Sequence, residues 1–263
     1  MPFWKDPPPA HIFEFSDAGI AHVRGTHIEF AKLPHDAIAQ VVRPEAGAKK
    51  RRQAAVLLPD SSARISVLDF DSFPDATEEQ LSLVRFRVKK TIPFDIDSAA
   101  VSHYRQAGVN RKGKIEVVTV TVPLEILARY EALFRNAGFH PGDITISALA
   151  ALNLCHDPEP AIIAKLAEKT LTLMVVADGK LKLFRCLTLE TANEDEILSV
   201  LQPTLAYAED ELGVPVKRIL ACGDPGVWRL ASGALAAEPL RSRFGTPTPF
   251  NAGLYGYLES TGA

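Results

Sequence analysis

No spacing of reactive residues in this sequence matches a known catalytic motif. The Gly-x-Ser-x-Gly, His-Glu-x-x-His and Walker patterns are all absent. Ser147 and the pair Ser61-Ser62 have no neighbouring motif that would activate a hydroxyl as a nucleophile. The seven histidines follow no common zinc-ligand spacing. The chemistry-bearing residues therefore predict neither a metal centre nor a catalytic nucleophile.

The composition is typical of a globular protein. Of 263 residues, 47% are hydrophobic and 23% are charged, and the formal net charge of −3 creates no field that attracts nucleic acid. No apolar run reaches the roughly 18–20 residues of a membrane span, and the N-terminus lacks the apolar core of a signal peptide. The three cysteines form no Cys-x-x-Cys pair and suit a reducing compartment. We therefore expect a cytoplasmic protein that does not bind nucleic acid.

Each half of the sequence opens with three short apolar segments separated by turn residues, which predicts a β-meander in each half. The segments are residues 12–15, 20–23 and 27–30 in the first half and 161–166, 170–177 and 180–189 in the second. Asp178-Gly179 is a hairpin-turn pair between the last two. This long-range repeat predicts two related α/β lobes that face each other.

The elements between and after the meanders follow from apolar periodicity and from helix start signals. Thr77-Glu78-Glu79-Gln80 has the capping-box pattern that begins a helix. Strands are expected at 54–58, 64–70, 115–122 and 216–222, helices at 77–90, 124–137, 195–212, 227–236 and 251–258, and a buried strand or helix at 144–154. The resulting division is a flexible tail at 1–11, a first-lobe meander at 12–53, an inserted α/β subdomain at 54–143 and a second lobe at 144–263.

Two short stretches, and the order of the elements around them, resemble the PilM proteins of type IV pilus assembly. Ile92-Pro93-Phe94 follows a Lys- and Arg-rich helix end, and Ala137-Gly138-Phe139 ends the next helix. The resemblance implies an actin-like (ribonuclease H-like) two-lobed α/β fold with a subdomain inserted in the first lobe. It also implies a location at the cytoplasmic side of the inner membrane, where PilM proteins hold the N-terminal tail of the membrane protein PilN. Many of these proteins bind ATP between the lobes.

The same resemblance locates a nucleotide site, whose residues are altered here. The first phosphate turn, roughly Asp-Ile-Gly-Ser in the family, matches Glu14-Phe15-Ser16-Asp17, and the second matches Lys165-Leu166-Ala167-Glu168. A lysine has only donors and cannot ligate magnesium. Residues 189–194 also leave no room for the helical subdomain that usually closes over the nucleotide. We therefore expect no ATP hydrolysis and neither ATP nor magnesium as a cofactor. The altered positions are Ser16, Asp17, Lys165, Ala167, Gly223 and Asp224.

The partner's tail is expected in a groove between the first lobe and the inserted subdomain. The strands at 54–58 and 115–122 are the candidates for pairing with an extended peptide, while alternate side chains would enter apolar pockets. Acidic residues would meet the basic residues that flank PilN tails. The residues expected at this contact are Phe86, Arg87, Ile92, Phe94, Asp95 and Asp97. The alternative is that Phe86, Ile92 and Phe94 only fill the core of the subdomain.

A basic run, Lys49-Lys50-Arg51-Arg52, is a candidate contact with anionic lipid head groups, although such runs are commonly solvated loops. Two other functions remain open. An actin-like ATPase or kinase-like phosphotransferase would need acids at both phosphate turns, which Lys165 argues against. The cytoplasmic part of GspL from type II secretion normally continues into a membrane span, which this sequence does not show. The sequence favours a non-catalytic scaffold of a type IV pilus-like machine, peripheral to the inner membrane.

Overall fold

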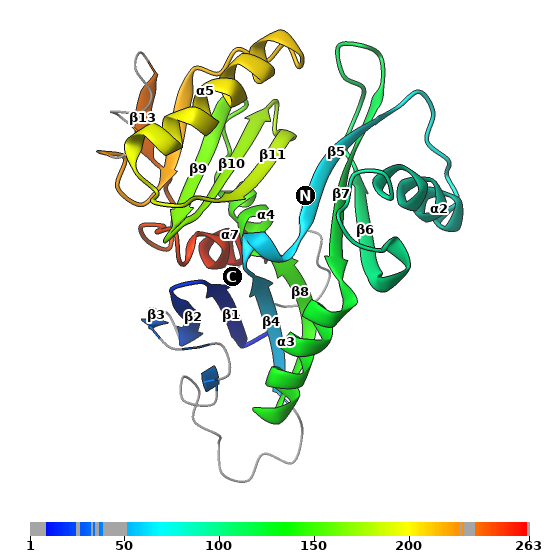
Figure 1. Ribbon diagram of the computed structural model, residues 1–263. Helices are drawn as coiled ribbons and strands as arrows, with labels where there is room; N and C mark the ends of the chain where they lie inside the picture. Colours follow the sequence, from blue (N-terminus) through cyan, green and yellow to red (C-terminus); the bar gives the residue numbers. More distant parts are fainter. Residues whose placement is uncertain are drawn as a thin grey trace.

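The computed structural model contains two lobes and a smaller sheet beside the first lobe (Figure 1). It describes residues 9–24, 27–32, 34, 37–38, 52–226, 228 and 235–261. The strands are β1 (His11–Ser16), β2 (Gly19–Arg24), β3 (His27–Ala31), β4 (Arg52–Leu58), β5 (Arg64–Phe70), β6 (Ala99–Arg105), β7 (Ile115–Pro123), β8 (Phe139–Ile146), β9 (Ala161–Ala167), β10 (Thr170–Ala177), β11 (Lys180–Thr188), β12 (Arg218–Cys222) and β13 (Ala236–Pro239). The helices are α2 (Thr77–Val88), α3 (Leu124–Asn136), α4 (Ser147–Ala151), α5 (Glu194–Asp210) and α7 (Ala252–Thr261), with short 3-10 turns η2 (Asp60–Ser62), η3 (Ile96–Ser98) and η4 (Leu152–Leu154).

The sheets of the two lobes have the same strand topology. Their orders are β3-β2-β1-β4-β8 in the first lobe and β11-β10-β9-β12-β13 in the second. In each sheet three antiparallel strands form a meander, and two more strands add in parallel beside the first strand of that meander. The internal repeat expected from the sequence is therefore present in the fold, and β1 of the first lobe corresponds to β9 of the second.

Helices α4 and α7, each of which follows the last strand of one lobe, pack together between the two sheets (Figure 1). Glycine allows their backbones to approach closely. A Cβ on Gly256 would lie 2.0 Å from the carbonyl oxygen of Ala150, and one on Gly253 would lie 2.6 Å from that of Ser147. Any larger residue at these positions would push the helices apart, so this contact sets how closely the lobes approach.

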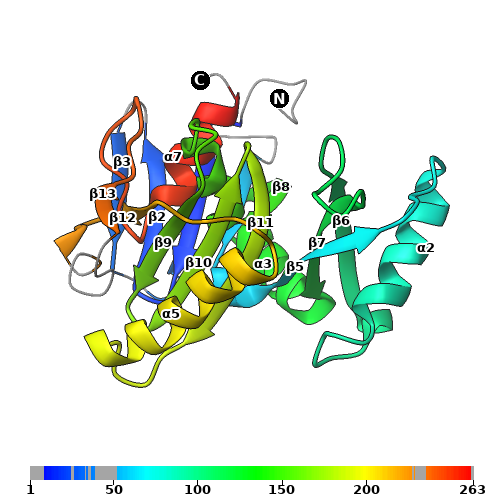
Figure 2. The ribbon, with the colours of Figure 1, turned by 90° about the horizontal axis from the view of Figure 1, so that it is seen from above.

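Other helices cover the outer faces of the sheets. Helix α5 lies across the second-lobe sheet (Figure 2) and buries Ile197 and Leu201 against it. Helix α3 covers the first-lobe sheet, where Phe134 packs edge-to-face against Phe13 and Phe139. Both helices have an amphipathic pattern, which favours one buried face.

The inserted subdomain is a three-stranded sheet of order β5-β7-β6 with α2 on one face (Figure 2). Its extent differs from the expected 54–143 at both ends. Strand β4 pairs in parallel with β1 and β8, so it is a central strand of the first lobe and not part of the insertion. Residues 54–58 are all apolar and fully buried, which is typical of a parallel strand covered on both faces. Strand β8 likewise belongs to the first-lobe sheet.

Most other elements lie close to their expected positions. Residues 144–154 form the end of β8 followed by α4 and η4, and only five residues separate β11 from α5. These five residues are too few to form an additional helical subdomain at this point of the chain, as the sequence predicted. Residues 227 and 229–234 of the helix expected at 227–236 lie outside the described residues, and residues 236–239 form β13 instead.

Candidate functional site

Lys165 is the centre of a buried group of charges between the lobes. It lies on β9, in a strand that is otherwise apolar, and only 2% of the residue is exposed. Its Nζ lies 3.1 Å from Asp60 Oδ2 and 3.5 Å from Glu14 Oε1, and it donates to Ser147 Oγ. Glu14 comes from β1, the strand that corresponds to β9. Opposite charges at matching positions of the two lobes therefore meet at their interface.

The two carboxylates are also hydrogen-bonded to the elements around them. Glu14 accepts from Ser147 Oγ and, at 2.7 Å, from the backbone N–H of Leu254 in the first turn of α7. Asp60 accepts from the backbone N–H of Ala148 at 2.8 Å and from Thr172 Oγ1 at 2.9 Å. These bonds satisfy free amides at the starts of α4 and α7. We name Glu14, Asp60, Ser147, Lys165 and Thr172 the interlobe cluster.

The electrostatics of the interlobe cluster favour a charged lysine. Burial alone would lower the pKa of Lys165, but the carboxylates of Asp60 and Glu14 outweigh burial and raise it. Burial raises the pKa of Glu14, against the opposing effects of Lys165, Ser147 and the Leu254 N–H. Burial also raises the pKa of the neighbouring Cys222 thiol to about 12, which keeps that thiol neutral. Among the described residues, no group of three His, Cys, Asp or Glu side chains could hold a metal ion.

The two meander turns contact each other directly. Thr170 Oγ1 donates to Asp17 Oδ2 at 2.7 Å, which joins the turn after β1 to the turn after β9. Ser16, at the position of the expected glycine, donates its hydroxyl to the Gly19 carbonyl inside its own turn. Ala167 is buried. The Ser16 hydroxyl and the Asp17 carboxylate thus both have hydrogen-bond partners inside the protein.

Gly223 and Asp224, the remaining two of the altered positions, are also held by local contacts. Gly223 has a positive φ of 98°, and a Cβ there would approach Pro249 Cδ to 3.0 Å. Asp224 Oδ1 accepts from the backbone N–H of Gly226 at 2.8 Å. The aspartate therefore stabilises its own turn, a common role for this residue type.

Separate contacts tie the inserted subdomain to the second lobe. Gln106 is buried, and its amide donates to the Leu181 carbonyl and accepts from the Leu181 N–H, both at 2.9 Å. The side chain thus occupies the edge of β11 as a neighbouring strand would. Nearby, Lys182 Nζ lies 2.6 Å from Glu116 Oε2, and both side chains are largely buried.

A groove of about 730 Å³ lies between the first lobe and the inserted subdomain, and residues of α7 and of the β10–β11 hairpin also line it. Strands β6 and β8 both line it, and each ends its own sheet, so each has one edge without a partner strand in the described part of the chain. We name it the β6–β8 groove. Its apolar lining includes Tyr104, Val120, Ile144, Leu149 and Leu152.

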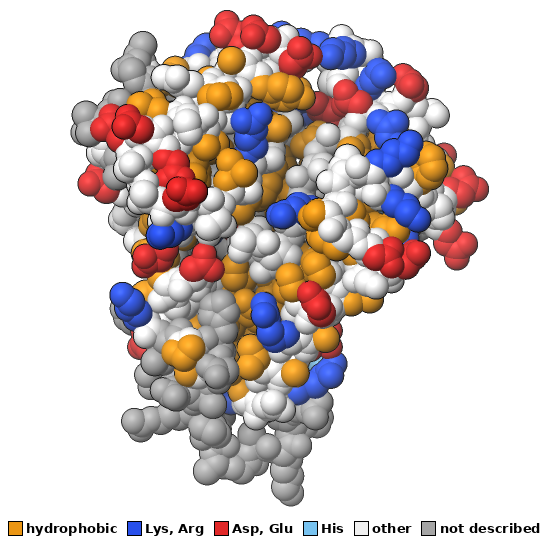
Figure 3. Space-filling model, viewed as in Figure 1, with side chains coloured by type: hydrophobic (Ala, Val, Ile, Leu, Met, Phe, Trp, Pro, Cys, Tyr) orange, Lys and Arg blue, Asp and Glu red, His pale blue; other side chains and the backbone are white. Residues whose placement is uncertain are grey.

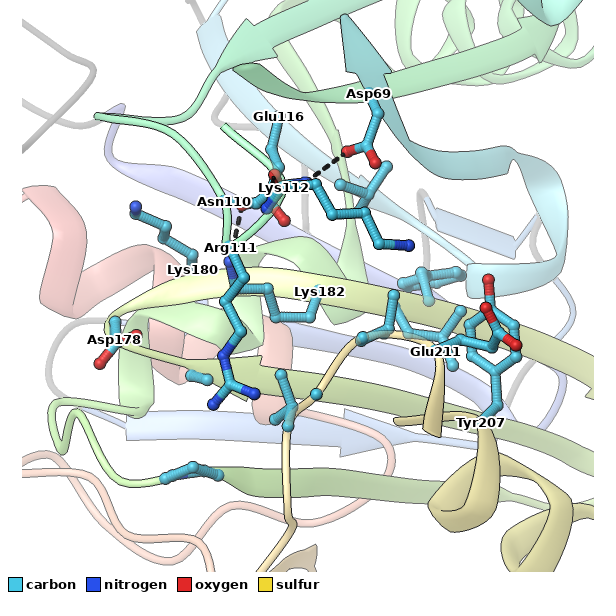
Figure 4. Close-up of a pocket in the computed structure, with 18 of the residues that line it drawn as sticks. Asp69, Asn110, Arg111, Lys112, Glu116, Asp178, Lys180, Lys182, Tyr207 and Glu211 are labelled. Carbon is cyan, nitrogen blue, oxygen red and sulfur yellow. Dashed lines mark hydrogen bonds and ion pairs between the residues drawn. The ribbon is translucent and has the colours of Figure 1, made fainter. Parts of the chain in front are cut away.

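A second groove, of about 570 Å³, separates β5 from β11 and is hollowed into the face seen in Figure 3. Its side chains are of both charge signs (Figure 4). Asn110 donates to Asp69, and Arg111 extends from the β6–β7 loop to within 2.3 Å of where a Cβ on Gly213 would lie. This β5–β11 groove is therefore crossed by the Arg111 side chain and by the Lys182–Glu116 ion pair.

The residues expected to contact a partner's tail do not line the β6–β8 groove. Phe86 is 63% exposed on α2, and Ile92 packs in the core beneath that helix, on the opposite face of the subdomain sheet. Arg87 lies 5.4 Å from the ring of Phe70, and Phe94 is half-buried near the same helix end. Asp97 pairs with Arg85 at 3.0 Å, while Asp95 accepts from the Asp97 N–H.

The strands expected to pair with a peptide are also unavailable. Strand β4, with its buried residues 54–58, lies between β1 and β8, and β7 lies between β5 and β6. Both edges of each strand are therefore already hydrogen-bonded. At the β6–β8 groove the free edges in the described part of the chain are those of β6 and β8, because each of these strands ends its sheet.

The basic run is described only at its last residue. Lys49, Lys50 and Arg51 lie outside the described residues. Arg52 begins β4, and its guanidinium carbon lies 4.1 Å from the centre of the Phe139 ring. This contact gives Arg52 a stacking role within the first lobe. In the described part of the chain, no helix combines the length and apolarity needed to cross a bilayer.

Two lobes of the same strand order, joined by α4 and α7, define an actin-like fold. The sequence matches no protein-family model and no curated protein. The structure is PilM-like: it is similar to a chain of the PilM–PilN type IV pilus biogenesis complex, with a TM-score of 0.73 at 16% identity, covering 97% of this chain and 99% of that one.

Two further structures have the same fold. The cytoplasmic domain of EpsL, an inner-membrane component of the type II secretion system of Vibrio cholerae, matches with a TM-score of 0.55 at 12% identity over 81% of each chain. A Bacteroides thetaiotaomicron protein with an actin-like ATPase fold matches with a TM-score of 0.51 at 8% identity over 88% of each chain. At these identities the likeness establishes the fold, and function has to be argued from the site.

Proposed function

We propose that the protein is a non-catalytic adaptor of a type IV pilus-like assembly machine, held at the cytoplasmic face of the inner membrane by a PilN-like membrane protein. The β6–β8 groove carries this proposal. Part of its wall is apolar, it lies beside the first lobe and the inserted subdomain, and two strands with a free sheet edge line it. A similar structure comes from a complex of PilM with PilN.

An extended peptide suits such a groove. A peptide that adds to the edge of β6 or β8 gains backbone hydrogen bonds, and alternate side chains point into the groove. Tyr104 is 48% exposed at the wall, and Leu149 and Leu152 are half-buried on the other side. The tail we propose is therefore apolar and extended, as PilN tails are expected to be.

The interlobe cluster supports a role without catalysis. An ATPase of this fold needs acids that hold a metal and its water near the phosphates. Here the corresponding position of the second lobe is Lys165, whose ammonium already contacts two carboxylates. The contact between Asp17 and Thr170 also joins the turns that would surround phosphates. We infer that partner binding is independent of ATP.

The test is calorimetric titration of the protein with the N-terminal tail peptide of a PilN-like protein from the same organism, with and without MgATP. We expect micromolar or tighter binding with the same affinity in both conditions. A scrambled peptide of the same composition is the control. Absence of heat at high-micromolar peptide would refute the adaptor, and an affinity that depends strongly on ATP would indicate a nucleotide switch.

A further inference from the structure

The interlobe cluster joins four separate parts of the chain around one ammonium group. Lys165 comes from the second-lobe sheet, Glu14 from the first-lobe sheet, Asp60 from the link to the inserted subdomain and Ser147 from the start of α4. Each of these residues is at most 4% exposed. Every polar contact of Lys165 named above is with a residue outside its own lobe sheet.

The geometry points to a built-in structural cation: we propose that the ammonium of Lys165 holds the two lobes in one closed arrangement and makes a bound metal or nucleotide unnecessary for closure. This inference does not depend on the identity of any partner. It assigns Lys165 a positioning role and no part in catalysis.

The arrangement of donors and acceptors indicates that the positive charge of Lys165 is needed at this position, and that the size of its side chain would not be enough. Two buried carboxylates face the same point, and each would be costly to bury without a cation. Their remaining oxygens accept from the Leu254 and Ala148 amides and from Thr172. An apolar side chain of similar length would leave both carboxylates without their shared counter-charge.

The first test compares wild type with Lys165→Met, which removes the charge and keeps most of the side-chain length. Breaking a buried ion pair by removing one partner predicts a melting temperature lower by roughly 6–20 °C for a chain of this size. The matched control is the triple variant Glu14→Gln, Asp60→Asn and Lys165→Met, which removes all three charges. We expect the triple variant to recover at least half of the loss. A Lys165→Met protein as stable as wild type would overturn the proposal, as would a triple variant no more stable than the single one.

The pH dependence gives a second readout. In Lys165→Met the pKa of Glu14 should rise further above its ordinary 4.5, because Lys165 no longer opposes burial. A carboxyl whose pKa is raised on folding costs stability as pH rises from its unfolded pKa towards its folded pKa. The loss of stability of Lys165→Met relative to wild type should therefore be smaller at pH 5 than at pH 8. The other ionisable groups near the cluster are Asp60, Cys222, Cys186 and Arg64. A loss of stability that is equal at pH 5 and pH 8, or larger at pH 5, would contradict the proposal that the charge of Lys165 holds the lobes together.

The wild-type protein provides a test that does not depend on any variant folding. Amide hydrogen exchange in α4 and in the first turn of α7 should be slow without ligand and unchanged by MgATP or by magnesium alone. Faster exchange of these segments in Lys165→Met than in wild type is the expected sign of loosened lobes. If MgATP slows exchange in these segments of the wild type, closure depends on ligand and the built-in cation is refuted.

Discussion

The interlobe cluster and the β6–β8 groove both lie where separate parts of the chain meet, but they differ in how the space there is filled. At the cluster, Glu14, Asp60 and Lys165 fill the space with charges that satisfy each other, and almost no surface is left. At the groove, β6 and β8 leave sheet edges open around a volume of about 730 Å³. The difference teaches that charged side chains fill the space between the lobes, whereas the groove beside the insertion stays open, and it is there that we propose the partner binds.

Asp60→Ala should produce the largest effect if the interlobe cluster is structural. The change removes the acceptor of Lys165, Ala148 and Thr172 together. Removing one partner of a buried pair costs about 3–5 kcal/mol of unfolding free energy. Urea denaturation measures this loss. At a temperature where the variant is folded, its affinity for the tail peptide should match that of wild type.

The control for this variant is Asp97→Ala. Asp97 also pairs with a cation, Arg85, but its side chain is 76% exposed. Exposed pairs contribute about 0–1 kcal/mol, so this change should be near neutral. An equal loss of unfolding free energy in Asp60→Ala and Asp97→Ala would show that the buried ion pair contributes no more than the exposed one. The contrast drawn for the interlobe cluster would then be wrong.

Gln106→Ala should give an intermediate effect, because Gln106 links the inserted subdomain to the second lobe. The change leaves the N–H and the carbonyl of Leu181 without their partner. An unsatisfied buried group costs about 1–3 kcal/mol, which urea denaturation would show. Faster amide exchange at Leu181 should accompany it. The control is Gln202→Ala on the exposed side of α5, where the same change should have little effect. Unchanged exchange at Leu181 would contradict the proposed link.

The sequence was informative about the lobes because each meander has apolar segments bounded by turn residues. Asp178 and Gly179 both adopt positive φ, 54° and 68°, as expected for a hairpin turn. The substitution at Lys165 was also visible. The partners of Lys165 could not be identified from the sequence. Asp60 is far away in sequence, and only the tertiary fold brings it close to β9. A signal did exist: one acid in β1 and one lysine in β9 interrupt apolar strands at matching positions.

The groove was harder to predict than the cluster. An edge strand and a central strand can have the same apolar pattern, and the sheet order decides which is which. Strand β7 carries the apolar run expected for an edge that binds peptide, but β5 and β6 cover both of its sides. The Ile92-Pro93-Phe94 stretch had two interpretations, a contact with the partner or a part of the subdomain core, and Ile92 packs in that core beneath α2.

Tyr104→Ala tests the proposed role of the β6–β8 groove in binding the tail. Tyr104 lines the β6–β8 groove and is 48% exposed, so its loss should weaken tail binding by about 5–10-fold, as for a peripheral aromatic anchor. The free energy of unfolding should fall by about 1 kcal/mol, because half of the side chain is buried. Calorimetry and urea denaturation measure the two effects.

The control for Tyr104→Ala is Phe86→Ala. Phe86 is 63% exposed but lies on α2, away from the groove. Its removal should leave tail binding unchanged. If Phe86→Ala weakens binding and Tyr104→Ala does not, the partner binds the α2 face, as the sequence first suggested, and the β6–β8 groove is not the site.

Thr170→Val should give a small effect, and it tests which feature of the interlobe space would exclude nucleotide. The change removes the hydroxyl that donates to Asp17 across the two turns. Since Asp17 is exposed, we expect a loss of about 0.5–1.5 kcal/mol, measured by urea denaturation. Loosening the turns leaves the Lys165 ammonium in place, so MgATP at millimolar concentration should not raise the melting temperature of the variant. A ligand that binds the folded state must raise this temperature once it exceeds its dissociation constant. A clear rise in Thr170→Val that is absent in wild type would mean that the contact between the turns, and not the buried lysine, keeps nucleotide out. A single hydrogen bond between the turns would then exclude ATP from the space between the lobes. In that case the buried charges would not be what closes this space, and the contrast with the open groove would fail.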